Sequence, residues 1–141
     1  MPDTLRVLVT GSRTWKDVLM LAAVLLDTWH DAVMLGVNIL WVHGDCEQGA
    51  DSIADALLCS WGFKPERHPA DRHRWGRSAF TKRDEEMVDA GAHLCLAFID
   101  LCVKSTCQRK RPHGSHGTSY TAGLAERAGI PTQRFGVMAN A

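Results

Sequence analysis

The sequence VLVTGSRTW spans residues 7–15 and sets a pattern that the rest of the chain repeats. Its first residues are typical of a buried strand, which stops at Gly11-Ser12-Arg13. Asp17 follows, placed to cap a helix. A strand that ends in small residues before a helix presents backbone N–H groups and a positive dipole end. Gly11, Ser12 and Arg13 are therefore candidates to bind a phosphate; an ordinary turn without a ligand is the alternative.

The same strand–turn–helix unit recurs along the chain. We expect strands at residues 5–10, 39–43, 64–69, 93–99 and 132–135, and helices at 18–29, 50–61, 80–90 and 117–128. The third strand contains two prolines and should lie at an edge. Residues 71–77 are expected as a polar loop and residues 100–115 as an irregular insertion. Strands separated by helices predict an α/β fold with a mostly parallel, doubly wound sheet.

Composition narrows the class of protein. The chain has 141 residues, enough for a single domain with a sizeable core. Its 16 Lys and Arg balance its 16 Asp and Glu, which gives no reason to expect bulk attraction to nucleic acid or membranes. We expect no membrane span, no signal peptide and a cytoplasmic protein. Of the five cysteines, Cys46, Cys59 and Cys95 are then expected as reduced thiols, and Cys102 and Cys107 are considered below.

Three loops should meet at the carboxyl edge of the predicted sheet, where ligands bind in folds of this class. They are, in chain order, residues 11–13, 43–51 and 115–118. Each loop supplies small residues and precedes a helix, which favours a nucleotide-sized ligand. The candidate ligand-binding residues are Gly11, Ser12, Arg13, Trp15, His43, Gly44, Asp45, Gly49, Asp51, Arg83, Ser115, Gly117 and Thr118.

Several segments, in matching order from about Leu5 to Phe135, resemble the YspA-type (cpYpsA-related) members of the SLOG superfamily. They are residues 9–15, 43–46, 49–51, 68–71, 76–77, 82–83 with Met87, 97–98 and 115–118. The resemblance implies a Rossmann-like three-layer sandwich, a bacterial or phage origin, and binding of a nucleotide or a nucleotide-derived ligand. The whole chain, 1–141, would then be one SLOG-type domain.

The superfamily also contains the "lonely guy" phosphoribohydrolases, which cleave N-glycosidic bonds. Arg83 with Met87 is similar to their Arg-Lys-x-x-Met signature, and Gly117-Thr118 to the end of their glycine-rich loop. Position 84 is Asp instead of Lys, and Ser119-Tyr120-Thr121 stand where the catalytic glutamate would follow. A hydrolase would need another acid, since cleavage requires a carboxylate near the water or ribose. The candidates are Asp45, Asp51, Asp71 and Glu85, and we name Arg83 and Asp45 as the catalytic pair.

Each single-residue assignment has a structural alternative. Arg13 and Arg83 suit phosphate oxygens, or they form ion pairs, for Arg83 with Glu86. Asp51 suits a ribose hydroxyl or stabilises the first turn of its helix. His43 faces the pocket or is a satisfied structural group, and Trp15 stacks on a base or fixes its loop to the domain.

The irregular insertion carries Cys102, Cys107, His113 and His116. Two thiolates and two imidazoles are ligands that zinc binds tetrahedrally, and the metal would order a loop without a core. We therefore predict a structural zinc site, with a Cys102–Cys107 disulfide or free thiols as the alternatives, and His116 facing the ligand as another.

Three functions compete at this stage. The first is a nucleotide-binding protein, such as a sensor or a sequestering protein; the second is an N-glycosidic-bond hydrolase or transferase. The third is a DNA-associated or protein-interaction module, which the basic cluster near Arg72 favours and the neutral charge of the chain opposes. Homodimerisation is a further expectation, although no exposed apolar stripe is evident from the sequence.

Overall fold

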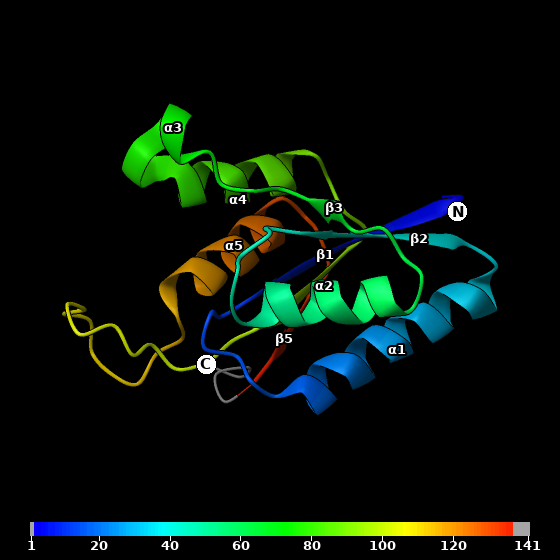
Figure 1. The fold of residues 1–141 in the computed structure, drawn as a ribbon, viewed down its shortest axis with the longest axis horizontal. Coiled ribbons are helices and arrows are strands. Elements are labelled where there is room, and N and C mark those ends of the chain that lie inside the picture. Colours follow the sequence, from blue (N-terminus) through cyan, green and yellow to red (C-terminus); the bar gives the residue numbers. More distant parts are fainter. Residues whose placement is uncertain (1, 137–141) are drawn as a thin grey trace.

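The computed structural model describes residues 2–136 as an α/β fold with three layers (Figure 1). Its elements are β1 (Thr4–Gly11), α1 (Val18–Leu35), β2 (Asn38–His43), α2 (Ala50–Ser60), β3 (Glu66–Arg67), α3 (Arg72–Trp75), the 3-10 turn η1 (Gly76–Ser78), α4 (Ala79–Asp89), β4 (Leu94–Phe98), α5 (His116–Arg127) and β5 (Thr132–Phe135). The predicted strands and helices are all present. The polar loop predicted at residues 71–77 is wrong in part, because the Asp71 side chain caps a short helix there.

The five strands form one sheet in the order β3-β2-β1-β4-β5, and every neighbouring pair is parallel. The strands β2 and β3 lie on one side of β1, and the chain then crosses over to place β4 and β5 on the other side. The strand order therefore reverses between β1 and β4, as in a Rossmann-like sheet, which confirms the predicted fold class. The outer strands are short, with two residues in β3 and four in β5.

Alternating side chains of the central strands pack against the two helical layers. Val7 and Val9 point toward α1 and α2, where they join Leu21 and Leu58 in one core cluster. Leu8 lies on the other face with residues of α4 and α5. Because β1 is buried on both faces, its apolar run is continuous and not alternating, as the sequence predicted.

The helix α1 leaves an apolar stripe on the outside of the molecule. Leu19 is 83% exposed, and Leu26, Val33 and Met34 are exposed with it. The expectation that no such stripe exists is therefore wrong. The 18 residues of α1 are also long and apolar enough to cross a membrane by length and composition, with a mean hydropathy of 1.6. Its other side packs on the sheet through Leu21, as a core helix does.

Candidate functional site

The first and third predicted loops meet at Ser12. The hydroxyl of Ser12 forms a hydrogen bond with the hydroxyl of Ser115 and accepts the backbone N–H of Asp100 at 2.9 Å. Ser12 itself is buried. The residues that follow β1 are thus joined to the start of α5, on the two sides of the point where the strand order reverses.

The second loop reaches the same place through Gly49 and Ala50. The Ala50 N–H donates to the carbonyl oxygen of Ser12 at 3.2 Å. Gly49 has φ 76° and ψ −147°, and a Cβ atom there would lie 2.2 Å from the same carbonyl oxygen. Only glycine allows this approach, so α2 begins directly against the end of β1. The prediction that the three loops converge is confirmed.

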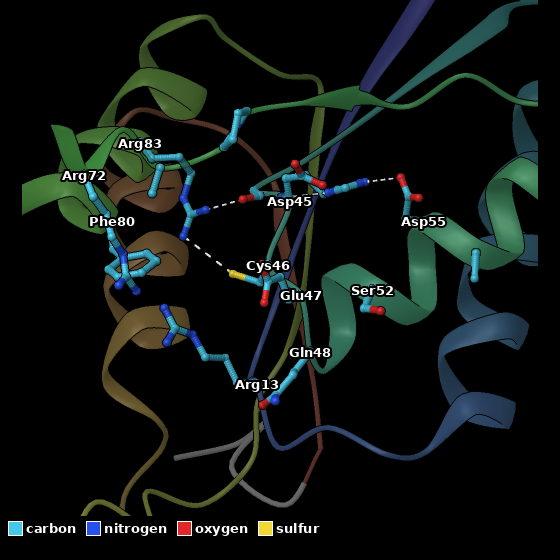
Figure 2. A pocket seen from close by; sticks show the side chains of 15 residues that line it. Arg13, Asp45, Cys46, Glu47, Gln48, Ser52, Asp55, Arg72, Phe80 and Arg83 are labelled. Atoms are coloured by element: carbon cyan, nitrogen blue, oxygen red, sulfur yellow. Dashed lines mark hydrogen bonds and ion pairs between the residues drawn. The ribbon is translucent and has the colours of Figure 1, made fainter. Parts of the chain in front are cut away.

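Two adjoining cavities follow this edge of the sheet. The larger, of about 890 Å³, lies over the loop after β2 (Figure 2), and the smaller, of about 520 Å³, lies between the loop after β1 and the start of α5. We call the two together the cleft. Four residues line both cavities: Arg13, Cys46, Phe80 and Arg83. The two cavities therefore adjoin at these four residues, and together they offer room for a nucleotide.

Three guanidinium groups surround the ring of Phe80 in the cleft (Figure 2). The guanidinium carbons of Arg13, Arg72 and Arg83 lie 4.3, 4.9 and 5.5 Å from the ring centroid. Within residues 2–136, no carboxylate lies within ion-pair distance of Arg13 or Arg72. The aromatic face holds Arg13 and Arg72 in place without neutralising them, so these two guanidinium groups can attract an anion.

Arg83 has a different environment, because it is only 7% exposed and its donors face protein groups. Its Nε donates to Asp84 Oδ1 at 2.7 Å, and its Nη1 donates to the carbonyl oxygen of Gly44. The ion-pair alternative thus holds for Arg83, although the partner is Asp84 and not Glu86. Burial raises the pKa of Asp84, since desolvation penalises the carboxylate. Arg83 fixes the loop after β2 on α4.

Two buried residues of the second loop, His43 and Asp51, hold the loop in place through hydrogen bonds. His43 is fully buried: its Nδ1 accepts the Asp45 N–H at 2.9 Å, and its Nε2 faces Asp55 Oδ1 at 2.8 Å. Both ring nitrogens are used, which supports the structural alternative for His43. Asp51 is buried and accepts the Cys46 N–H at 3.3 Å, and burial raises the pKa of its carboxyl group. Asp51 does not line either cavity.

Trp15 also lies away from the cleft. Its ring packs edge-on against Phe98, with centroids 5.5 Å apart, and its Nε1 donates to the carbonyl oxygen of Asp17. This arrangement fixes the loop after β1 to the body of the domain, as the alternative assignment for Trp15 stated. The ring is buried and does not line either cavity, so it is not available for stacking on a base.

The start of α5 lies at the smaller cavity, where the sequence placed candidate ligand-binding residues. Ser115, Gly117 and Thr118 line the smaller cavity with Gly11 and Ser12. Ser115 is the N-cap residue of α5 but makes no side-chain capping bond, because its hydroxyl is bonded to Ser12. The first-turn N–H groups of α5 therefore border the cavity, together with the positive end of the helix dipole.

The four candidate acidic residues differ in whether they line the cleft. Asp45 lines the larger cavity, in a left-handed backbone conformation with φ 55°. Asp51 is buried below the loop, and Asp71 caps α3 by accepting the Arg74 N–H. Glu85 accepts the hydroxyl of Tyr120 at 3.1 Å, outside the cleft. Of these four carboxylates, only Asp45 lies where a ligand would contact it.

The insertion brings its two cysteines and two histidines together. The ligand atoms of Cys102, Cys107, His113 and His116 all lie within 4.8 Å of one another. The sulfur of Cys107 is 3.4 Å from His113 Nε2 and 3.2 Å from His116 Nε2, and the two Nε2 atoms are 3.2 Å apart. Four such atoms around a tetrahedral zinc ion would lie about 3.3 to 3.8 Å apart, given the usual zinc–ligand distances.

The protonation states around this cluster suit a metal ion. His113 Nδ1 lies 2.9 Å from the carbonyl oxygen of Lys110, the partner that directs the Nε2 lone pair toward the cluster. A backbone hydrogen bond at Lys104 lowers the pKa of the Cys102 thiol, and burial with neighbouring cations lowers the pKa of His116. Thiolate and neutral imidazole are the forms that bind metal, so these four residues could hold a metal ion.

Comparison with known proteins identifies a phage relative. The chain is 39% identical over 139 residues to "Gene 61 protein" of Mycobacterium phage D29, a match that covers 93% of this chain and 96% of the relative. The chain belongs to the Gene 61 protein family. No protein-family model matches the chain, and no solved structure matches it either.

In this member of the Gene 61 protein family, the cleft residues that sequence reasoning missed include Phe80 and Asp84. Phe80 lies at the centre of the arginine cluster, and Asp84 lines the smaller cavity beside Arg83. A signal for Phe80 was present, because it precedes Arg83 by three residues and therefore shares its helix face. Asp84 gave no such signal, since an acidic residue next to an arginine is normal on an exposed helix.

Proposed function

We propose that this protein binds a nucleotide or a nucleotide-derived ligand in the cleft. The observation that carries the proposal is the pair of uncompensated guanidinium groups, Arg13 and Arg72, over the ring of Phe80. Arg13 also lines the smaller cavity together with the start of α5, and Arg72 lines the larger cavity. A phosphate held between these cations and a helix N-terminus would gain charge-assisted hydrogen bonds from both.

The two cavities suit different parts of such a ligand. The phosphate would lie in the smaller cavity, against Ser12 and the first turn of α5. The sugar and base would extend into the larger cavity, where Asp45 offers a carboxylate to ribose hydroxyl groups. This placement follows the general rule for open parallel sheets, in which ligands lie outside the carboxyl ends of the strands at the point of reversal.

We further infer that the chain is a YspA-type member of the SLOG superfamily, on the motif resemblance described above. Binding without hydrolysis is the function proposed for it. The chain lacks a carboxylate directly after Gly117-Thr118, and Arg83 is engaged by Asp84 and Gly44. The relative from a phage supports a role in the cytoplasm of a host cell, where the five unpaired cysteines would stay reduced.

A thermal-shift experiment tests nucleotide binding. AMP, ADP, ADP-ribose and NAD are added in turn to the purified protein, and at least one should raise the melting temperature by about 9 °C at a hundredfold excess over its dissociation constant. Arg13→Ala should remove that shift, because it deletes a cation that no carboxylate neutralises. Arg127→Ala, an exposed change on the far end of α5, should keep it. A wild-type protein that responds to none of the four compounds contradicts the proposal.

For the cluster of Cys102, Cys107, His113 and His116, we propose a structural zinc ion. The proposal is supported by the interatomic distances and by the count of ligands, since four protein ligands leave no open position for a substrate. Protein purified without affinity tags and without added metal should contain about one equivalent of zinc. Cys107→Ser should remove most of it and Cys59→Ser none. A wild-type zinc content below about a tenth of an equivalent rejects the site.

A further inference from the structure

The insertion of residues 100–115 forms one wall of the smaller cavity. Leu101, Cys102, Val103 and Lys104 line that cavity from the insertion, opposite Thr10 and Arg13. Cys102 and His116, two members of the cysteine–histidine cluster, line it as well. The cluster and the phosphate-binding part of the cleft therefore share residues.

Both ends of the insertion are attached to the sheet at the cavity. The Asp100 side chain accepts the hydroxyl of Thr14 at 2.7 Å, and the Ser115 N–H donates to the carbonyl oxygen of Asp100 at 2.9 Å. The segment between these ends has no helix or strand, only an isolated bridge between Leu101 and Gly114. Its order thus depends on local contacts, which include the cluster of four candidate ligands and the hydrogen bonds of Arg111 to the carbonyl oxygens of Cys102 and Lys104.

Hydrogen bonds hold the backbone of Lys104 next to the cysteine–histidine cluster. Its carbonyl oxygen accepts the N–H of Cys107 at 3.1 Å and also a donor from the side chain of Arg111. Its side chain is exposed and borders the smaller cavity, where the phosphate is proposed to bind. A metal ion bound by Cys107 would therefore fix the position from which the Lys104 ammonium group reaches the cavity.

We propose that Lys104 is a phosphate-binding residue, and that a metal ion at the cysteine–histidine cluster positions Lys104 and the start of α5 for the ligand. This inference rests on the proposed nucleotide-binding function. His116 makes the second connection, because it is both a cluster residue and the first residue of α5. Metal and nucleotide then bind with positive coupling, and by linkage each raises the affinity for the other.

The test compares AMP binding, by isothermal titration calorimetry, across matched variants. Cys107→Ser removes a metal ligand that does not line the smaller cavity, whereas Cys59→Ser changes an exposed cysteine on α2. The affinity for AMP should fall by about fivefold or more in Cys107→Ser and stay unchanged in Cys59→Ser, within the usual range for coupled sites. Circular dichroism and metal analysis confirm that Cys107→Ser is folded and has lost zinc.

Lys104→Ala supplies an independent measurement, because an exposed side chain can be shortened without loss of the fold. It should bind AMP about tenfold more weakly while it retains zinc, as expected for loss of one charged hydrogen bond. Equal AMP affinity in wild type, Cys107→Ser and Lys104→Ala overturns the inference and leaves nucleotide binding intact. Failure of the zinc-loaded wild type to bind AMP or any of the other three nucleotides overturns the proposed function, and the coupling with it.

Discussion

Replacement of Gly49 by alanine should lower the free energy of unfolding by about 3 kcal/mol or more. The backbone of Gly49, at φ 76° and ψ −147°, occupies a region that is nearly restricted to glycine and costs other residues about 1–3 kcal/mol. The new Cβ would also lie 2.2 Å from the Ser12 carbonyl oxygen and 2.5 Å from Arg13 Cα. Relief of this overlap requires α2 to move away from β1, which adds a similar cost.

Gly36→Ala is the matched control for Gly49→Ala. Gly36 also has a positive φ, 71°, but nothing lies within 4 Å of its missing Cβ. Gly36→Ala should therefore lower the free energy of unfolding only by the cost of the left-handed conformation, about 1 kcal/mol. Urea unfolding of both variants measures the difference. Equal losses would show that the contact between the loops after β1 and before α2 does not constrain the fold.

The second large effect is expected for Arg83→Met, which should cost about 3 kcal/mol at pH 8. The change removes the partner of a buried carboxylate, and loss of one member of a buried ion pair leaves the other charge uncompensated. Arg83 and Asp84 have side chains that are 8% and 9% exposed, so water offers little compensation. The Gly44 carbonyl oxygen also loses its donor.

The loss in Arg83→Met should depend on pH. Burial already raises the pKa of Asp84 in the wild type, and removal of Arg83 should raise it further. A carboxyl group whose pKa is higher in the folded state stabilises the fold when protonated, and this contribution disappears as the pH rises through the folded-state pKa. The destabilisation should therefore be smaller at pH 5 than at pH 8.

Urea unfolding at both pH values checks this result. The double variant Arg83→Met/Asp84→Asn is the control, because an amide needs no counter-charge; it should recover stability at pH 8 and lose the pH dependence. A loss in Arg83→Met that is the same at pH 5 and pH 8 would contradict a role for the ionised Asp84.

Much of the architecture could be predicted from the sequence because the pattern is strong. The apolar runs around Val9 and Trp41 fit buried parallel strands, and small residues follow each of those strands, so the order of elements and the edge that holds the cleft were both accessible. The cysteine–histidine cluster was accessible for another reason. Its ligands lie within one short insertion, where chain connectivity alone keeps them close.

The interior of the cleft was less accessible, because it depends on contacts between distant segments. Asp51 and His43 are both buried, and their polar atoms are bonded to other residues of the protein. The spacing of residues in the sequence does not encode those contacts. The arginine cluster is similar, since Arg13 and Phe80 meet only when α4 packs across the end of the sheet.

Because the outer strands β3 and β5 are short, they should limit edge-to-edge pairing of the sheet in concentrated solution. β3 and β5 contribute two and four residues, so each flank of the sheet exposes few backbone groups that an extended peptide could pair with. Within residues 2–136, the two flanks therefore offer little template for amyloid-like stacking of copies. Association of folded copies is expected to proceed mainly through side chains, such as the exposed apolar residues of α1.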